Sequence, residues 1–159
     1  MTDQSSRIRV RNAVAEDVPR LMELACCAAT AAQWSPAEYQ KLFAPVAVHQ
    51  RLTLVLEEDA VALGFLVARP LDDEWEIENI AVNGPARRRG LGTRLLGEFM
   101  TLVEKRGGKH VFLEVRESNR AARALYEKWA FVESGKRKSY YHNPEEDALV
   151  LKFSFSRQP

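Results

Sequence analysis

The chain has 159 residues with 46% hydrophobic and 28% charged residues, and its formal net charge is +1. This length predicts a single domain, 1–159, with a buried core, and the balanced charge excludes a global attraction to nucleic acid or to a membrane. No stretch of about 18 apolar residues occurs and residues 1–11 are polar, so we expect neither a membrane span nor a signal peptide but a cytoplasmic protein.

Cysteine and histidine are sparse. The two cysteines, Cys26 and Cys27, are neighbours in a helical pattern, where we expect buried or half-buried thiols and no disulfide. The histidines His49, His110 and His142 are scattered along the chain. The sequence therefore predicts no metal site.

Strands are predicted where apolar and polar residues alternate, and helices where apolar residues recur at i, i+3 and i+4. In chain order we expect a strand over 8–11, a helix over 15–32, a short helix after Ser35, strands over 52–56, 61–68 and 75–82, a helix from 91 to 106, a strand over 111–115, a helix over 118–128, and strands over 131–140 and 148–155. The order βααβββαβαββ predicts an α/β fold, a mixed central sheet with helices on both faces.

Local signals support these elements. Pro19 falls in the first turn of the first helix, where a missing N–H is harmless. Ser35 is a helix cap with Glu38 at the capping-box position, and Asn119 is a second good cap. The acidic residues 57–59 predict the turn of a hairpin.

A loop rich in glycine and arginine joins the strand that ends at Val82 to the following helix. The start of a helix presents unpaired N–H groups and the positive end of the helix dipole, which together hold phosphate. The glycines permit close approach of the backbone, and the arginines add positive charge. The residues expected to hold a pyrophosphate are Arg87, Arg88, Arg89, Gly90, Leu91, Gly92 and Thr93.

Two common nucleotide loops do not match. A P-loop ends in Gly-Lys-Ser/Thr, whereas Thr93 and Arg94 follow Gly92. A dinucleotide fold needs a third small residue, and Leu95 stands there. The pattern Arg-x-x-Gly-x-Gly from Arg87 instead resembles the coenzyme A loop of the GCN5-related N-acetyltransferases. A solvated basic turn is the alternative.

A second motif strengthens this resemblance. Residues 113–119 read Leu-Glu-Val-Arg-Glu-Ser-Asn, residues 121–126 read Ala-Ala-Arg-Ala-Leu-Tyr, and Phe131 follows. With both motifs the chain is identified as a member of that family, and it closely resembles the branch that acetylates the N-terminal alanine of ribosomal proteins. The resemblance implies a mostly antiparallel mixed sheet, acetyl-CoA as cosubstrate, no metal, a ribosomal protein N-terminus as acceptor, and a monomer or weak homodimer.

The resemblance also implies the catalytic pair, with Glu114 as general base and Tyr126 as general acid. A charged residue within the apolar run 111–115 is costly unless it is paired or functional, so a structural ion pair with Arg116 or Arg123 is the alternative for Glu114. The alternative for Tyr126 is a core tyrosine. Tyr126 lies two helical turns after Asn119, so both could face the cofactor.

The strand before the loop supplies further candidates. Its end, Ile80, Ala81 and Val82, can pair with the pantetheine arm, and the Val82 amide can polarise the thioester carbonyl. Glu78 is a rival base, because period-two alternation places Glu76, Glu78, Ile80 and Val82 on one face.

Three aromatic residues are candidates for the acceptor site. Trp34 is either a packing anchor or a wall of the cleft, and Tyr140 and Tyr141 either grip a peptide terminus or pack in the sheet. A small-amine acetyltransferase and a non-catalytic CoA-binding module remain alternative functions.

The chain departs from the family pattern at two places. Trp129-Ala130-Phe131 replaces the usual Leu-Gly-Phe, and a left-handed Ala130 costs about 1 kcal/mol relative to glycine. His142-Asn143-Pro144 follows the two tyrosines in place of a proline. Both changes bear on the shape of the turn and of the acceptor cleft.

Overall fold

The computed structural model describes residues 7–28, 31–44 and 50–156, so His49 lies outside the described residues. Except for two short 3-10 turns, the elements follow the predicted order βααβββαβαββ. They are β1 (Ile8–Asn12), η1 (Ala15–Asp17), α1 (Val18–Cys26), α2 (Pro36–Lys41), β2 (Leu52–Glu58), β3 (Val61–Leu71), β4 (Glu74–Val82), η2 (Gly84–Ala86), α3 (Leu91–Lys105), β5 (His110–Arg116), α4 (Arg120–Lys128), β6 (Val132–Tyr141) and β7 (Glu146–Ser154).

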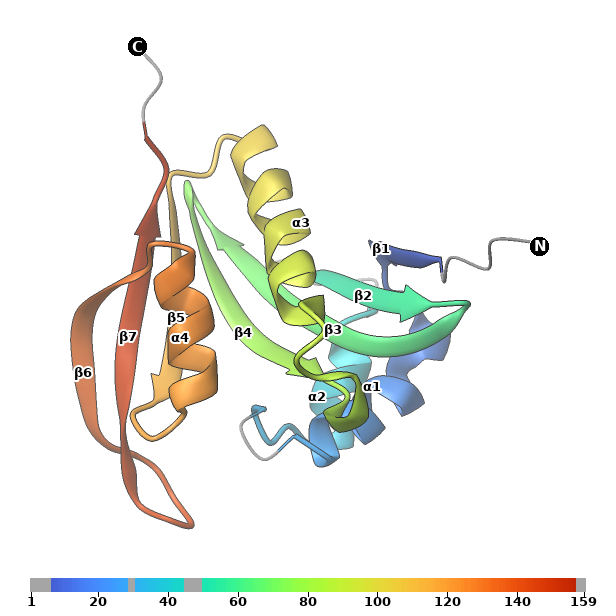
Figure 1. Ribbon diagram of the computed structural model, residues 1–159, viewed down its shortest axis with the longest axis horizontal. Helices are drawn as coiled ribbons and strands as arrows, with labels where there is room; N and C mark the ends of the chain where they lie inside the picture. The colour runs from blue at the N-terminus through green and yellow to red at the C-terminus, as the bar shows by residue number, and fades with distance from the viewer. Residues whose placement is uncertain (1–6, 29–30, 45–49, 157–159) are drawn as a thin grey trace.

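One seven-stranded sheet organises the fold, in the order β1-β2-β3-β4-β5-β7-β6. Neighbouring strands are antiparallel except β4 and β5, which are parallel. Helices α3 and α4 lie on one face, and α1 and α2 lie on the other, behind the sheet in Figure 1. The predicted α/β class, with a mostly antiparallel mixed sheet and helices on both faces, is confirmed.

Each face has its own apolar core. Leu95, Leu96 and Phe99 of α3 are fully buried against one face, and Leu21 of α1 packs with Phe65 of β3 on the other. Burying these apolar faces is the main source of stability for the elements that carry the site. No helix within the described ranges is long and apolar enough to cross a bilayer.

The sheet opens between β4 and β5. These strands pair only over Glu74–Ile77 and His110–Leu113, although β4 continues to Val82 and β5 to Arg116. In Figure 1 the half-sheet containing β5, β7 and β6 diverges from the half containing β1 to β4 below this short ladder. The end of β4 therefore has a strand partner on one side only.

A β-bulge at Glu78 changes which face the end of β4 presents. Ile77 pairs with Ala68 and Asn79 pairs with Val67, so Glu78 has no partner in the ladder. The bulge inserts one residue and inverts the alternation that follows it.

The prediction that residues 76, 78, 80 and 82 share one face is therefore wrong. Ile80 and Val82 pack against the same core as Ile77, although an unbroken strand would turn them to the other face. Ala81 packs instead with the α1 core. Sequence alternation cannot reveal an inserted residue of this kind.

Helix α1 ends at Cys26, whereas the periodicity predicts a helix to residue 32; residues 29–30 lie outside the described ranges. The buried side chain of Asn79 accepts a hydrogen bond from the Ala32 N–H at 3.1 Å, which holds this segment against β4 outside the helix. Cys26 and Cys27 are exposed, so the prediction of buried or half-buried thiols is wrong. They lie beside the buried stripe of α1, not on it.

The hairpin between β2 and β3 is confirmed, but its turn is Asp59–Ala60, where φ is 49° and 66°. Glu57 belongs to β2, is only 3% exposed and is bound by Arg9 and Arg11. The acidic stretch is therefore partly a buried charge network.

Helix caps follow the sequence closely. Ser35 and Glu38 form the predicted capping box of α2, and Asn119 caps α4 by accepting from the Ala122 N–H at 3.1 Å. Ala130 adopts the left-handed conformation with φ 64°, and the Phe131 N–H donates to the carbonyl of Tyr126, five residues earlier, at 3.0 Å. The strain foreseen for alanine at this position is present.

Candidate active site

The free edge of β4 offers backbone hydrogen-bonding groups. The Asn83 N–H donates to the Leu63 carbonyl of the β3 side at 2.7 Å. Because successive residues of a strand point their N–H and C=O groups to opposite sides, those of Val82 point away from β3. The Arg87 Nε–H donates to the Val82 carbonyl at 3.3 Å. An extended chain could therefore pair with this edge as an added strand.

The start of α3 lies just beyond that edge. Gly90 is the N-cap with φ 73°, no side chain caps the helix, and its first turn holds no acidic residue. The first intrahelical bond is from the Arg94 N–H to the Gly90 carbonyl, at 3.0 Å. The N–H groups of Leu91, Gly92 and Thr93 therefore have no intrahelical acceptor, which suits an anion.

The three arginines of the loop differ in their surroundings. Arg89 forms a bidentate ion pair with Glu58 of β2, at 2.7 and 2.9 Å, and so ties the loop to the hairpin. Arg87 reaches the carbonyl of Val82, whereas Arg88 is exposed and makes no ion pair with a described residue. Arg87 and Arg88 are thus better placed than Arg89 to meet a phosphate.

Gly92 sits in the first turn of α3 between β4 and α4. A Cβ atom there would lie 3.5 Å from Leu125 Cδ2 and 3.9 Å from Val82 Cγ2, which are ordinary contact distances. Close packing therefore does not require glycine here. Gly90 is a loop residue whose positive φ favours glycine.

Tyr126 lies on the buried side of α4, two turns after the Asn119 cap. It is 3% exposed, and its ring centroid is 5.5 Å from that of Phe131 in an edge-to-face arrangement. Burial, with a smaller contribution from Tyr141, raises the pKa of its phenol above the ordinary value. Its hydroxyl makes no hydrogen bond within the described part of the chain. It is a protonated donor in an apolar setting.

Glu114 projects from β5 on the face opposite α3 and α4, and its side chain is 19% exposed. Its Oε1 lies 3.0 Å from Nε of Arg137 on β6. The two arginines considered as alternatives are used elsewhere: Arg116 pairs with Glu146 at 3.4 Å, and Arg123 donates to a backbone carbonyl at 2.8 Å. Arg137 could not be predicted as the partner, because β7 lies between β5 and β6 in the sheet.

Tyr140 and Tyr141 join this cluster. A hydrogen bond to Glu114 is the main cause of a raised pKa at Tyr140, and burial raises the pKa of Tyr141 to about 12. The two rings are 5.1 Å apart, with the guanidinium of Arg137 5.2 Å from the Tyr140 ring and that of Arg116 4.2 Å from the Tyr141 ring. Both phenols remain protonated at neutral pH.

A second bulge lies in the part of β6 that carries these tyrosines. Arg137 pairs with Ala148 and Tyr141 with Glu146, so β6 has extra residues between these two pairs. Ser139 takes a positive φ of 51°, and its N–H donates to Asp147 at 2.8 Å. The bulge is thus held in place from β7.

Glu78 and Trp34 form a separate cluster. Arg51 holds the Glu78 carboxylate at 2.6 and 3.2 Å, and Arg69 lies 3.7 Å away. The guanidinium of Arg51 is 5.8 Å from the Trp34 ring, which is itself 5.4 Å from the ring of Tyr39. The structure therefore joins Glu114 with Tyr140 and Tyr141, and leaves Glu78 in its own ion pairs.

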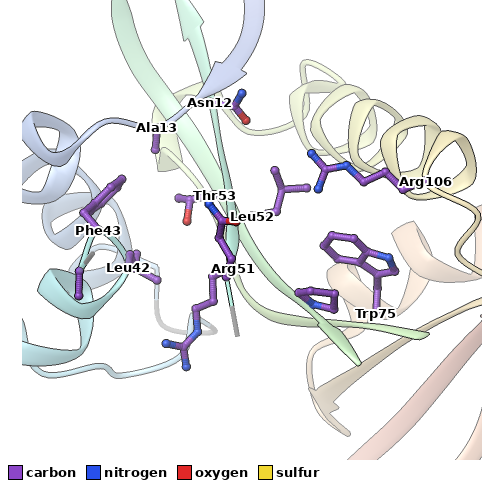
Figure 2. A pocket seen from close by; sticks show the side chains of 12 residues that line it. Asn12, Ala13, Leu42, Phe43, Arg51, Leu52, Thr53, Trp75 and Arg106 are labelled. Atoms are coloured by element: carbon purple, nitrogen blue, oxygen red, sulfur yellow. The ribbon is translucent and has the colours of Figure 1, made fainter. Parts of the chain in front are cut away.

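A cavity of about 540 Å³ lies at the opposite end of the sheet, near the end of α3. Figure 2 shows Arg106 and Trp75 on one side of it and Leu42 and Phe43 on the other. None of the predicted site residues lines this cavity. Apart from Trp34, the candidate site residues of the described chain lie instead on or next to β4, β5, β6, α3 and α4.

Comparison with protein families and curated proteins gives consistent results. The family model described as Acetyltransferase (GNAT) family matches residues 18–131. A putative ribosomal protein bS18-alanine N-acetyltransferase of Bacillus subtilis is 30% identical, covering 92% of this chain and 95% of the relative. The ribosomal protein bS18-alanine N-acetyltransferase of Escherichia coli is 36% identical, covering 74% of this chain and 80% of the relative.

Solved structures agree with these sequences. The ribosomal-protein-S18-alanine N-acetyltransferase from Escherichia coli superposes with a TM-score of 0.85 at 29% identity, covering 96% of this chain and 97% of that one. Ard1 from Thermoplasma volcanium has a TM-score of 0.83 at 24% identity, covering 94% and 99% of the two chains, and shares the fold.

Proposed function

The chain belongs to the GNAT acetyltransferase family and is an N-acetyltransferase, and from this premise we propose that it acetylates the α-amino group at the N-terminus of a ribosomal protein. Enzymes of this family use acetyl-CoA. The observation that carries the proposal is the similarity to ribosomal protein bS18-alanine N-acetyltransferases, which extends over 92% of this chain and 95% of one relative.

The described residues suit coenzyme A. The unpaired amides at the start of α3, together with Arg87 and Arg88, offer donors and positive charge for the pyrophosphate. The free edge of β4 up to Val82 offers backbone groups for the amides of the pantetheine arm. Acetyl-CoA supplies the activated acetyl group, and these residues bind and orient it.

Acetyl transfer forms an N–C bond and breaks the C–S bond, so one proton leaves the amine and one reaches the sulfur. In our proposal Glu114 takes the amine proton, the Val82 N–H polarises the carbonyl and Tyr126 donates to the departing thiolate. The raised pKa of Tyr126 keeps its phenol protonated until the thiolate leaves. Glu78 is the weaker candidate for the base, because two guanidinium groups already hold its carboxylate.

The basicity of the acceptor favours an α-amine. An α-amino group has an ordinary pKa of about 7.7 to 8.0, whereas that of a lysine side chain is about 10.4. Near neutral pH a single carboxylate can deprotonate the first and is poorly matched to the second. An N-terminal acceptor therefore fits the site better than an internal lysine.

The test is a panel of short peptides incubated with acetyl-CoA and analysed by mass spectrometry. Peptides begin with alanine, serine, glycine or methionine, and one has a blocked N-terminus and an internal lysine. We expect a mass gain of one acetyl group on the alanine peptide and none on the blocked peptide. Efficient acetylation of the blocked lysine peptide would overturn the proposed acceptor.

A further inference from the structure

The ion pair between Glu114 and Arg137 joins two strands that are not neighbours in the sheet. Glu114 is in register with Val150 of β7, and Arg137 is in register with Ala148 of the same strand. Arg137 therefore crosses β7 to reach Glu114, and it passes a small, fully buried alanine. Among the described residues, Glu114 is the one carboxylate that Arg137 pairs with, and Arg137 is the one cation that pairs with Glu114.

The two partners differ in their freedom to move. Arg137 is 57% exposed and stands on the edge strand β6, whereas Glu114 is 19% exposed on the inner strand β5. Ion pairs with this much exposure contribute little to stability, so a competing cation can displace the guanidinium. The guanidinium also lies 5.2 Å from the ring of Tyr140, whose attraction persists when the ion pair opens.

Two cations that share one carboxylate repel each other, so a second cation at Glu114 would meet the charge of Arg137. An amine that approaches Glu114 arrives largely as an ammonium ion near neutral pH, and a second positive charge within about 4 to 6 Å is disfavoured. We propose that Arg137 is a displaceable counter-ion: it holds Glu114 while the acceptor is absent and leaves it when the acceptor's amino group binds. This inference rests on the proposed function, because it takes Glu114 as the group that receives the amine.

Peptide affinity tests the displacement. With CoA in place of acetyl-CoA no transfer occurs, so calorimetric titration gives the Kd of an alanine-starting peptide directly. Arg137→Gln should lower this Kd by about two- to fivefold, the effect of removing one exposed ion pair. Arg137→Lys should keep the wild-type value. Lys138→Gln removes the same charge from the next position of β6 without touching Glu114, and should change nothing.

A second peptide makes the test specific to the amine. The N-acetylated form of the same peptide has no amino group, so its Kd should not respond to Arg137→Gln. A Kd that rises or stays constant for the free-amine peptide would overturn the proposal. Equal gains for both peptides would also overturn it, because the arginine would then act on the body of the peptide.

The Nε–H resonance of Arg137 reports the ion pair without any acceptor. It should be protected from solvent exchange in the free protein, lose protection in Glu114→Gln, and lose it when the free-amine peptide is added to wild type. If wild type binds no peptide, the proposed acceptor is wrong. Exchange protection of the Arg137 Nε–H then tests the ion pair by itself. An unprotected resonance in the free protein overturns the counter-ion role.

Discussion

At the level of single residues, the hydroxyl of Tyr126 is the sharpest test of the chemistry. Tyr126→Phe removes one oxygen from a residue that is 3% exposed and makes no hydrogen bond within the described residues, so packing should survive. Loss of a general acid lowers turnover by roughly 10²- to 10⁴-fold. We expect that fall in kcat with a nearly unchanged affinity for acetyl-CoA, measured by steady-state kinetics and calorimetry.

Tyr140→Phe is the matched control, because it removes a phenol hydroxyl that binds Glu114 but is not assigned the proton transfer to sulfur. Its effect on kcat should be clearly smaller. Unaltered turnover in Tyr126→Phe would leave Tyr126 as a packing residue. A large loss of cofactor affinity would make it a binding residue.

The conformation of Ala130 leads us to expect that glycine at this position increases stability. It ends α4 in the left-handed region at φ 64°, where a Cβ atom is unfavourable. Ala130→Gly should therefore stabilise the protein by about 1 kcal/mol, measured by denaturant unfolding. Ala121→Gly, in the first turn of the same helix, should instead destabilise it. A loss of stability in Ala130→Gly would show that strain is relieved elsewhere.

Single-residue chemistry was only partly predictable. Glu114 and Tyr126 are implied by the resemblance to the family, and the interrupted apolar run and the spacing from the helix cap only support that assignment. Arg137 does not, since its contact with Glu114 depends on strand order and on register across β7. The assignment of Arg89 to Glu58 depends in the same way on a hairpin far away in sequence.

Among elements, the start of α3 depends on the conformation of Gly90 more than on that of Gly92. Gly90→Ala places a Cβ at φ 73° and should cost about 1 to 2 kcal/mol or tilt the free amides, so the affinity for CoA should fall. Gly92→Ala, where a Cβ finds ordinary contacts, should retain affinity. Calorimetric titration with CoA decides between them, and equal losses would contradict this division.

The existence of every strand and α-helix was predictable, because each has a strong period or a clear cap, but the two 3-10 turns were not. The ends of the elements were not predictable where residues distant in sequence determine them. Asn79 holds the segment after α1 outside the helix, and the bulge at Glu78 inverts the faces of β4. Both effects arise from partners that a local pattern does not contain.

For the molecule as a whole, the buried charge network at β1 links stability to pH. Arg11, followed by Arg9, lowers the pKa of Glu57 below 4.5, and Arg11 also lowers the pKa of Asp17. A carboxyl whose pKa is lower when folded contributes stability that is complete above its unfolded pKa. That contribution is lost as the pH falls through the folded pKa, so we expect acid destabilisation below about pH 4.5.

Arg11→Ala tests this network. Glu57 is only 3% exposed, and removing one partner of a buried pair costs about 3 to 5 kcal/mol; since Arg9 remains, we expect about 3 kcal/mol at neutral pH. The variant should also show a weaker pH dependence in denaturant unfolding between pH 3 and 6, a range of about three units around the carboxyl pKa values. Arg7→Ala is the control, because Arg7 contacts Asp59 through its backbone N–H, which the substitution keeps. A neutral Arg11→Ala would contradict the role of the pair.

The global architecture was predictable because two spaced motifs and the element order point to one family. The opening between β4 and β5 was not, since it requires knowing where a parallel ladder stops. That ladder has four register pairs, Glu74–Ile77 with His110–Leu113.

This short ladder also bears on how the chain folds. Strands β1 to β4 pair in sequence order, and β5 to β7 pair within one later stretch of chain, so each half needs only modest loop closures. The β4–β5 pairing must bring its strands together across the whole of α3. Because non-local contacts form slowly, docking of two preformed halves is the expected slow step of folding, with α3 as the hinge between them.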